Sequence, residues 1–211
     1  MDKKTKDTLV KVGTGIGIGL ALAGISKLVY DAYNKPDIFR QMKERVLSYR
    51  TDPFIRKTAN ELIKVIPHED ILNRVRAIYC HVQSVFNYLD DPYGLDYVAS
   101  PRELEIIGGG DCDCLSVYLA TLLVSSGHKT QLVFVPGHVF VRVYIPAYQK
   151  DDLPYDITYW PDITIQGKWK NLKGVWVPIE STGKNIDIGV LSEDTIAYLK
   201  KGQCRVMDLK G

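Results

Sequence analysis

The apolar pattern of this chain changes its period at Gly127, and this change constrains the fold more than any other feature. Before Gly127, residues 112–123 carry leucines at spacings of three and four, which are typical of a helix with one buried face. After it, residues 129–135 and 137–145 are rich in valine and aromatic residues, and Pro136-Gly137 between them is a tight-turn sequence. A helix followed by an antiparallel hairpin predicts an α+β domain.

A third strand is expected over residues 174–182, after a loop of about 28 residues that is long enough to serve as a flap. Side chains alternate along a strand, so one face of the second strand holds His138, Phe140, Arg142 and Tyr144, and one face of the third holds Trp176, Pro178 and Glu180. If the two strands are neighbours, His138 can pair with Glu180. The opposite face of the second strand is the more apolar one, so either both faces of the sheet are covered or the core lies on that opposite face.

Three amphipathic helices are predicted upstream, over residues 37–50, 52–66 and 68–90. The second opens on Asp52-Pro53, a usual pair for a cap and first turn. In the third, Cys80 and His81 are adjacent and point in different directions, so we expect a buried cysteine and a surface histidine.

Cys112 stands at the first turn of the helix that precedes the hairpin, with Asp111 as its expected cap. Unpaired N–H groups and the helix dipole favour a thiolate there, whereas Asp111 and Asp113 oppose it, so a histidine partner is required. Gly108 to Gly110 are expected to leave room for an extended substrate beside the sulfur. Cys114 is turned by about 200° from Cys112 and is not expected to share its chemistry.

The amino end carries a glycine-rich run of 15 uncharged residues between Lys11 and Lys27. Counted as a helix over residues 8–30, with the lysines reaching outward, it is about 34 Å long and could anchor the protein in a membrane or pack on another helix. In that case the protein is anchored at the cell envelope. The alternatives are a cleaved signal peptide with Ala21-Leu22-Ala23 as the cleavage signal, or a segment packed against protein in a virion component or a cytoplasmic assembly.

The composition fits one catalytic-sized domain with a short appendage. The chain has 211 residues, of which 45% are apolar, and a net charge of +2. We divide it into a segment and linker over residues 1–36 and a domain over residues 37–211. Residues 1–30 carry a charge of +3, which leaves −1 for the rest, so no broad basic surface for nucleic acid remains. Four cysteines are too few for a disulfide scaffold.

A metal site is another interpretation of the cysteines. Cys112 and Cys114 with His128 or His138 lack the paired spacing of structural zinc sites, and the helix directs the two sulfurs apart. We therefore expect no metal and no cofactor. His128 follows Gly127 at the helix end, where a surface position is expected.

Residues 110–135, 138–145 and 176–183 together carry a resemblance to a known family. They resemble the transglutaminase-like, papain-type superfamily, whose pattern is a Gly-Asp-Cys helix start, a His-Val-Phe/Trp strand and a Trp-x-x-x-Asp/Glu-x-Thr strand. Residues 85–109 resemble the lead-in of its microbial and phage-borne members. The resemblance covers residues 70–185. It implies a papain/transglutaminase-like core in which the nucleophile helix packs on an antiparallel sheet, with an N-terminal helical extension.

The resemblance also implies a catalytic triad. Cys112 would be the nucleophile, His138 the base and later acid, and Glu180 the residue that orients the imidazole; Asp156, 18 residues beyond His138, is the reserve acid. Relatives often have an acid at the position of Cys114, and an aspartate more often than a glutamate at the position of Glu180.

The chemistry of such a triad is acyl transfer. The sulfur attacks an acyl carbon, typically of an amide, and the N–H of Cys112 helps to hold the oxyanion. If water resolves the acyl-enzyme, the protein is a peptidase or amidase; if an amine does, it is a cross-linking transglutaminase. We favour hydrolysis because a transferase must exclude water. Peptides or proteins are the expected substrates, with peptidoglycan stem peptides and envelope or virion proteins as candidates. A catalytically inactive interaction module of an envelope or virion assembly is the alternative from another class.

Overall fold

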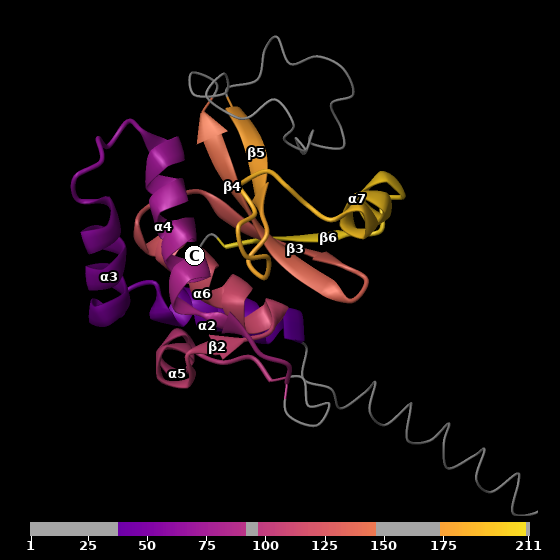
Figure 1. Ribbon diagram of the computed structural model, residues 1–211, viewed down its shortest axis with the longest axis horizontal. Coiled ribbons are helices and arrows are strands. Elements are labelled where there is room, and N and C mark those ends of the chain that lie inside the picture. Colours follow the sequence, from indigo (N-terminus) through magenta and orange to yellow (C-terminus); the bar gives the residue numbers. More distant parts are fainter. Residues whose placement is uncertain (1–37, 92–96, 147–173, 210–211) are drawn as a thin grey trace, which may run out of the picture. The chain divides into compact units, whose positions relative to one another are not determined.

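The computed structural model describes residues 38–91, 97–146 and 174–209 (Figure 1). The predicted amino-terminal segment over residues 8–30, most of the loop before the third strand and Asp156 lie outside these ranges. Among the described residues, no helix is both long enough and apolar enough to cross a bilayer.

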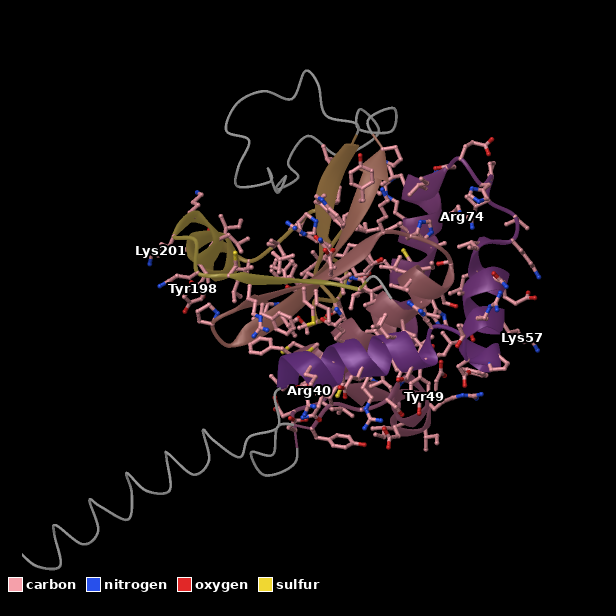
Figure 2. All side chains as sticks on the ribbon, turned by 180° about the vertical axis from the view of Figure 1, so that it is seen from behind. Arg40, Tyr49, Lys57, Arg74, Tyr198 and Lys201 are labelled. Atoms are coloured by element: carbon pink, nitrogen blue, oxygen red, sulfur yellow. The ribbon has the colours of Figure 1, made fainter. Side chains whose placement is uncertain are left out.

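Helices α2 (Ile38–Tyr49), α3 (Pro53–Ile63) and α4 (Ile71–Val85) confirm the three predicted amphipathic helices. The Asp52 carboxylate caps α3 by accepting the N–H groups of Phe54 and Ile55, at 2.9 and 3.2 Å. Helix α4 ends five residues earlier than predicted, because the chain continues as the short strand β1 (Asn87–Tyr88). Charged side chains such as Lys57 and Lys201 lie on the outside of the molecule (Figure 2).

The expected hairpin is present as β3 (Thr130–Val135) and β4 (His138–Pro146), joined at Gly137, whose φ of 75° suits a glycine in a tight turn. The third predicted strand is β5 (Gly174–Ile179), which pairs with β4. A fourth strand, β6 (Arg205–Asp208), pairs with β3. All pairs in this sheet are antiparallel, and the strand order is β5-β4-β3-β6.

Helix α6 (Cys112–Ser125) packs on β3 and β4 and is enclosed by α3, α4 and the short helix α5 (Pro101–Ile107). Ten of its 14 residues are buried, which is more than the single inward face that the leucine spacing predicts. Its position at the centre of the molecule explains the difference, because helices cover the faces of α6 that do not contact the sheet. The start of α6 therefore has a fixed place beside the sheet.

The second face of the sheet is covered by α7 (Glu193–Lys200), on the other side from α6 (Figure 1). A small core on this side joins Leu191 to residues of β3 and β4, with Ile196, Tyr198 and Leu199 packed against it; the strand residues are Val133, Val135 and Phe140. Both faces of the sheet are thus buried, which decides between the two possibilities left open by the sequence. Helices packed on an antiparallel sheet confirm the α+β class and the arrangement expected of a papain/transglutaminase-like core.

The glycines before α6 have a different role from the one expected. Gly109 and Gly110 form strand β2, which pairs in parallel with β1, and both are buried. A Cβ atom at Gly110 would lie 2.5 Å from the Cβ of Cys114, and one at Gly109 would overlap the carbonyl oxygen of Asn87. The small size of these residues lets the chain pack against itself, so the interpretation of Gly108 to Gly110 as room for a substrate is wrong for Gly109 and Gly110.

Candidate active site

Cys112 is the first residue of α6, as predicted. The Asp111 carboxylate caps the helix by accepting the N–H groups of Asp113 and Cys114, each at 3.1 Å. The Cys112 sulfur is partly buried, and its thiol donates to Oδ1 of Asp113 at 3.5 Å. The backbone N–H of Val139 also interacts with the sulfur. Since Val139 follows His138 in β4, the thiol lies close to the strand that carries the imidazole.

Strands β4 and β5 separate before Val139, and this separation leaves the backbone N–H of Val139 available to the thiol. The backbone groups of even-numbered residues in β4 form hydrogen bonds with β3, as the bond from Tyr144 N to Lys129 O shows. The backbone groups of odd-numbered residues, including Val139, therefore point toward the neighbouring strand β5. Pairing with β5 begins only at Val141 and Ile179. The freed N–H of Val139 binds the Cys112 sulfur, and its carbonyl accepts the hydroxyl of Ser116 at 3.2 Å.

Ser116 lies one turn after Cys112 on α6 and joins the two strands where they separate. Its Oγ is 2.9 Å from the Oγ of Ser181, the residue that would continue the pairing opposite Val139. The bonds from Ser116 to Val139 and to Ser181 are buried. They fix the first turn of α6 between the two strands.

His138 and Glu180 pair across the sheet, as the strand alternation predicts. The His138 Nε2 atom is 2.7 Å from Oε2 of Glu180, and the exposed fractions of the two side chains are 22% and 8%. The other carboxylate oxygen accepts the N–H and the hydroxyl of Thr182, at 3.1 and 2.7 Å. Burial opposes the charged form of Glu180, but the hydrogen bonds from His138 and Thr182 outweigh it and lower the pKa of the carboxyl group.

The Cys112 thiol has a raised pKa. Burial and the negative charge of Asp113 raise it to about 12, and the bond from Val139 only partly opposes them. The thiol is therefore protonated at neutral pH in the resting protein. The expectation that the helix end favours a thiolate is outweighed here by desolvation and by the acidic neighbours, so a base must remove the proton during attack.

Cys114 has a structural place, as expected. Its sulfur accepts the N–H of Ala99 at 3.2 Å and donates to the carbonyl of Tyr97 at 3.3 Å. It also belongs to one of two groups of possible metal ligands among the described residues: Asp91, Asp111 and Cys114 in the first, and Asp111, Cys112 and Asp113 in the second. Both groups share Asp111. Its carboxylate already caps α6, and this role explains why an acidic residue stands at position 111.

Three histidine and cysteine environments differ from the sequence-based expectations. Cys80 is exposed, and His81 is partly buried with a pKa that burial lowers, so the expected order is reversed. His128 is also mostly enclosed, and burial lowers its pKa to about 4, so the expected surface position is wrong. The Nε2 atoms of both histidines are buried and have no hydrogen-bond partner among the described residues. These environments depend on packing between distant segments, which helical spacing does not show.

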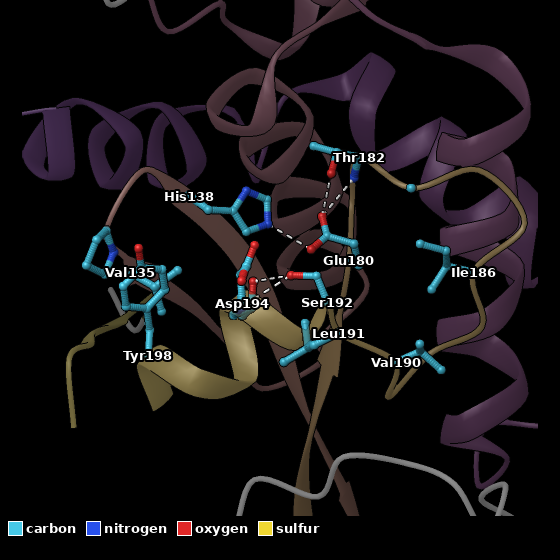
Figure 3. A pocket seen from close by; sticks show the side chains of 13 residues that line it. Val135, His138, Glu180, Thr182, Ile186, Val190, Leu191, Ser192, Asp194 and Tyr198 are labelled. Atoms are coloured by element: carbon cyan, nitrogen blue, oxygen red, sulfur yellow. Dashed lines mark hydrogen bonds and ion pairs between the residues drawn. The ribbon is translucent and has the colours of Figure 1, made fainter. Parts of the chain in front are cut away.

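A cavity of about 630 Å³ lies beside the histidine and carboxylate (Figure 3). Its walls come from β3 and β4, the segment after β5 and α7. The elements expected from the sequence end at Gly183, so Ser192, Asp194 and Tyr198, which line this cavity, are not among the predicted site residues. A signal for α7 exists in the sequence, because Ser192 is followed by two acidic residues and then by Ile196 and Leu199, which are three residues apart.

The chain is similar in fold to several solved structures at low identity. A candidate protease from Parabacteroides distasonis is 13% identical over 50% of this chain and 24% of its own length, with a TM-score of 0.41. EGTA-treated LapG from Legionella pneumophila is 21% identical over 52% of this chain and 65% of its own, with a TM-score of 0.37. A second LapG structure is 16% identical over 78% and 93%, with a TM-score of 0.35.

This chain therefore spans about a quarter of the first of these proteins. No family model and no curated protein matches it.

Proposed function

We propose that this protein is a thiol-dependent acyl hydrolase, a peptidase or amidase, with Cys112 as the nucleophile. One observation carries the proposal: the Cys112 sulfur binds the N–H of Val139, while the adjacent residue His138 pairs at 2.7 Å with Glu180. The candidate nucleophile thus interacts with the residue next to the candidate base, and the base is paired with the group that would orient it; the three residues come from α6, β4 and the end of β5.

His138 acts as the general base in this proposal. Its Nε2 faces Glu180, which leaves Nδ1 for the thiol proton. Because the thiol has a pKa of about 12, the proton moves to the imidazole as the sulfur attacks the acyl carbon. The Glu180 carboxylate stabilises the imidazolium that forms, and the same imidazole then protonates the leaving amine. Water, activated by His138, resolves the acyl-enzyme and restores the thiol.

The proposal is tested with an activated ester, N-acetylglycine p-nitrophenyl ester, and with iodoacetamide. We expect Cys112→Ala to abolish ester turnover and the thioester adduct seen by mass spectrometry. Cys114→Ala is the matched control, since its sulfur is held by Ala99 and Tyr97 and takes no part in the chemistry. His138→Ala is expected to slow both turnover and alkylation of Cys112. Equal turnover by the Cys112→Ala protein would contradict the proposal.

A catalytically inactive interaction module is the competing function. The raised pKa of the Cys112 thiol is the observation that favours it, because a buried protonated thiol is unreactive without a base. In that case Cys112 would react with iodoacetamide only at alkaline pH and independently of His138.

The acceptor and the substrate belong to the same proposal. Water is our preferred acceptor, and a cross-linking reaction with an amine is the alternative. Peptides or proteins are the proposed substrates, including peptidoglycan stem peptides and envelope or virion proteins. Quenched peptide and muropeptide libraries, screened for Cys112-dependent release, identify the class. Detergent partitioning of the full chain against a chain that starts at Asp37 tests the proposed membrane anchor over residues 8–30, and equal partitioning would contradict it.

A further inference from the structure

Glu180 lies just beyond the part of the sheet that is paired on both sides. Strand β5 is at one edge of the sheet, and its pairing with β4 ends at Ile179. In this register the backbone groups of even-numbered residues in and directly after β5 point away from β4. The carbonyls of Pro178 and Glu180 therefore lie on the outer edge, which β4 does not reach. The orientation of Glu180, on which its contact with His138 depends, must be fixed from outside the sheet.

Tyr79 of α4 supplies a hydrogen bond that a further strand would otherwise provide. The carbonyl of Pro178 accepts the N–H of Gly189 at 2.6 Å, and the carbonyl of Glu180 accepts the hydroxyl of Tyr79 at 2.7 Å. Only 2% of Tyr79 is exposed, so this bond is shielded from water, and water cannot readily replace it. A helix 101 positions away in the chain thus holds the backbone of Glu180.

Gln83 sets the direction of the Tyr79 hydroxyl. It lies one turn further along α4 and donates to the Tyr79 oxygen at 2.7 Å. A phenol has a single proton, and an oxygen that accepts from Gln83 has this proton available for the Glu180 carbonyl. The same amide nitrogen of Gln83 donates to the carbonyls of Gly183 and Ile186, at 2.7 and 3.1 Å. The segment from Glu180 to Ile186 is therefore held against α4 at both ends.

The carboxylate direction follows from the way the backbone is held. Tyr79 binds the carbonyl of Glu180, and the next residue, Ser181, is bound through its Oγ to Ser116 of α6 at 2.9 Å. Successive side chains of an extended chain point to opposite faces, so the Glu180 carboxylate points to the other face, where it meets His138 (Figure 3). A rotation of the backbone here would move the carboxylate away from Nε2.

We propose that Tyr79 is a positioning residue of the candidate active site: its hydroxyl, oriented by Gln83, keeps the Glu180 carboxylate on the imidazole of His138. This inference rests on the proposed function, because the pair matters for turnover only if His138 is the general base. The hydroxyl acts only as a donor. Burial and the negative charge of Glu180 hold the pKa of Tyr79 well above its ordinary value, so the hydroxyl keeps its proton.

The first test needs no turnover. In the full-length Cys112→Ala protein, the downfield ¹H NMR resonance of the His138 Nε2 proton reports its bond to Glu180, and the His138→Gln and Glu180→Gln changes assign it. We expect Tyr79→Phe to move this resonance upfield and to speed exchange of the proton with water about 3- to 10-fold, the effect of one neutral hydrogen bond. Gln83→Met keeps the side-chain length, removes the donor and should act in the same direction.

Tyr118→Phe is the matched control. Tyr118 is fully buried, as Tyr79 is, but its hydroxyl donates to Glu105 of α5, away from Glu180. This change should leave the His138 resonance where it is. The inference is overturned if Tyr79→Phe and Gln83→Met leave the resonance unchanged or if Tyr118→Phe alters it as much. A Cys112→Ala protein without this resonance also overturns it, because the bond that Tyr79 is proposed to fix would then exchange freely.

The second test is a double-mutant cycle with the activated ester and the active protein. Alone, Tyr79→Phe should lower kcat/KM about 3- to 10-fold. In the Glu180→Gln background it should lower kcat/KM by less than about twofold, because the group through which Tyr79 acts has been removed. Tyr118→Phe should have no effect in either background.

The two tests separate this inference from the proposed function. An equal loss from Tyr79→Phe in both backgrounds indicates a general structural effect; it overturns the inference and leaves the proposed function intact. Ester turnover that does not depend on Cys112, together with the expected NMR changes, overturns the proposed function. Tyr79 then still positions the imidazole and carboxylate, but the pair serves no catalysis.

Discussion

Replacing Glu180 by glutamine isolates the electrostatic part of the candidate site. The side chain keeps its size, and its amide oxygen can still accept the two hydrogen bonds from Thr182. The amide NH₂ then faces Nε2 of His138, which must become an acceptor. The ring proton moves to Nδ1, the nitrogen available to the thiol, so the imidazole can no longer take the proton of Cys112.

The expected loss follows from the bond that is removed. A hydrogen bond to a charged group contributes about 1.5–3 kcal/mol, and the 8% exposure of the Glu180 side chain leaves little solvent to replace it. Since about 1.4 kcal/mol is a factor of ten in rate, the loss of the charge alone lowers kcat/KM by about 10- to 150-fold. The wrong tautomer adds to this loss, so these values are a lower bound.

The assay is turnover of the activated ester by Glu180→Gln, compared with Glu61→Gln, an exposed acid on α3. Circular dichroism and urea unfolding establish that each variant is folded. A Glu180→Gln protein that is folded and retains at least half of the activity, while Cys112→Ala is inactive, would refute the role assigned to the carboxylate.

Three further predictions concern stability, measured by urea unfolding. His128 has a pKa of about 4 in the folded protein, which is below its value in the unfolded chain. Between these two values the unfolded chain binds one more proton, so the free energy of unfolding falls as the pH decreases from about 6.5 to 4. Relative to His128→Leu, the native protein should lose about 3 kcal/mol of this free energy. Ser116→Ala leaves the Val139 carbonyl and Ser181 hydroxyl without their partner and should cost about 1–3 kcal/mol. Gly110→Ala forces a Cβ against Cys114 and should cost about 1–3 kcal/mol.

Each of these variants has its own comparison. An unchanged pH dependence of stability in His128→Leu would contradict the assignment of that effect to His128. Ser84→Ala alters an exposed hydroxyl and should have little effect. If Gly110→Ala unfolds at the same urea concentration as the native protein, the close packing of β2 on α6 is not required for stability.

Local sequence signals predict the three strands β3, β4 and β5 and most helix starts. Asp52, Asp111 and the Pro136-Gly137 turn act within a few residues of themselves, so their effects can be inferred without a partner segment. Strand alternation also places His138 and Glu180 on compatible faces, and their contact at 2.7 Å follows once β4 and β5 are neighbours.

Environments that depend on several segments are predicted less well. Helical spacing does not show that Cys80 is exposed and His81 enclosed, because the neighbours that bury a helix face come from elsewhere in the chain. The same holds for the Cys112 thiol, since the helix end favours its charge while packing and Asp113 disfavour it. The cavity beside His138 is not predicted, because one side of it is formed by α7, which the expected elements do not include.

The amino-acid sequence by itself determined the class of the fold, the first turn of α6 with its thiol and the face of each central strand, because these follow from periodicity and from contacts between near neighbours. Only the tertiary structure decided that both faces of the sheet are covered, that the N–H of Val139 is left free for the Cys112 sulfur, and that Asp194 faces His138 across a cavity. These features arise where β5 separates from β4 and where α7 returns to the sheet, and they depend on contacts between residues far apart in the chain.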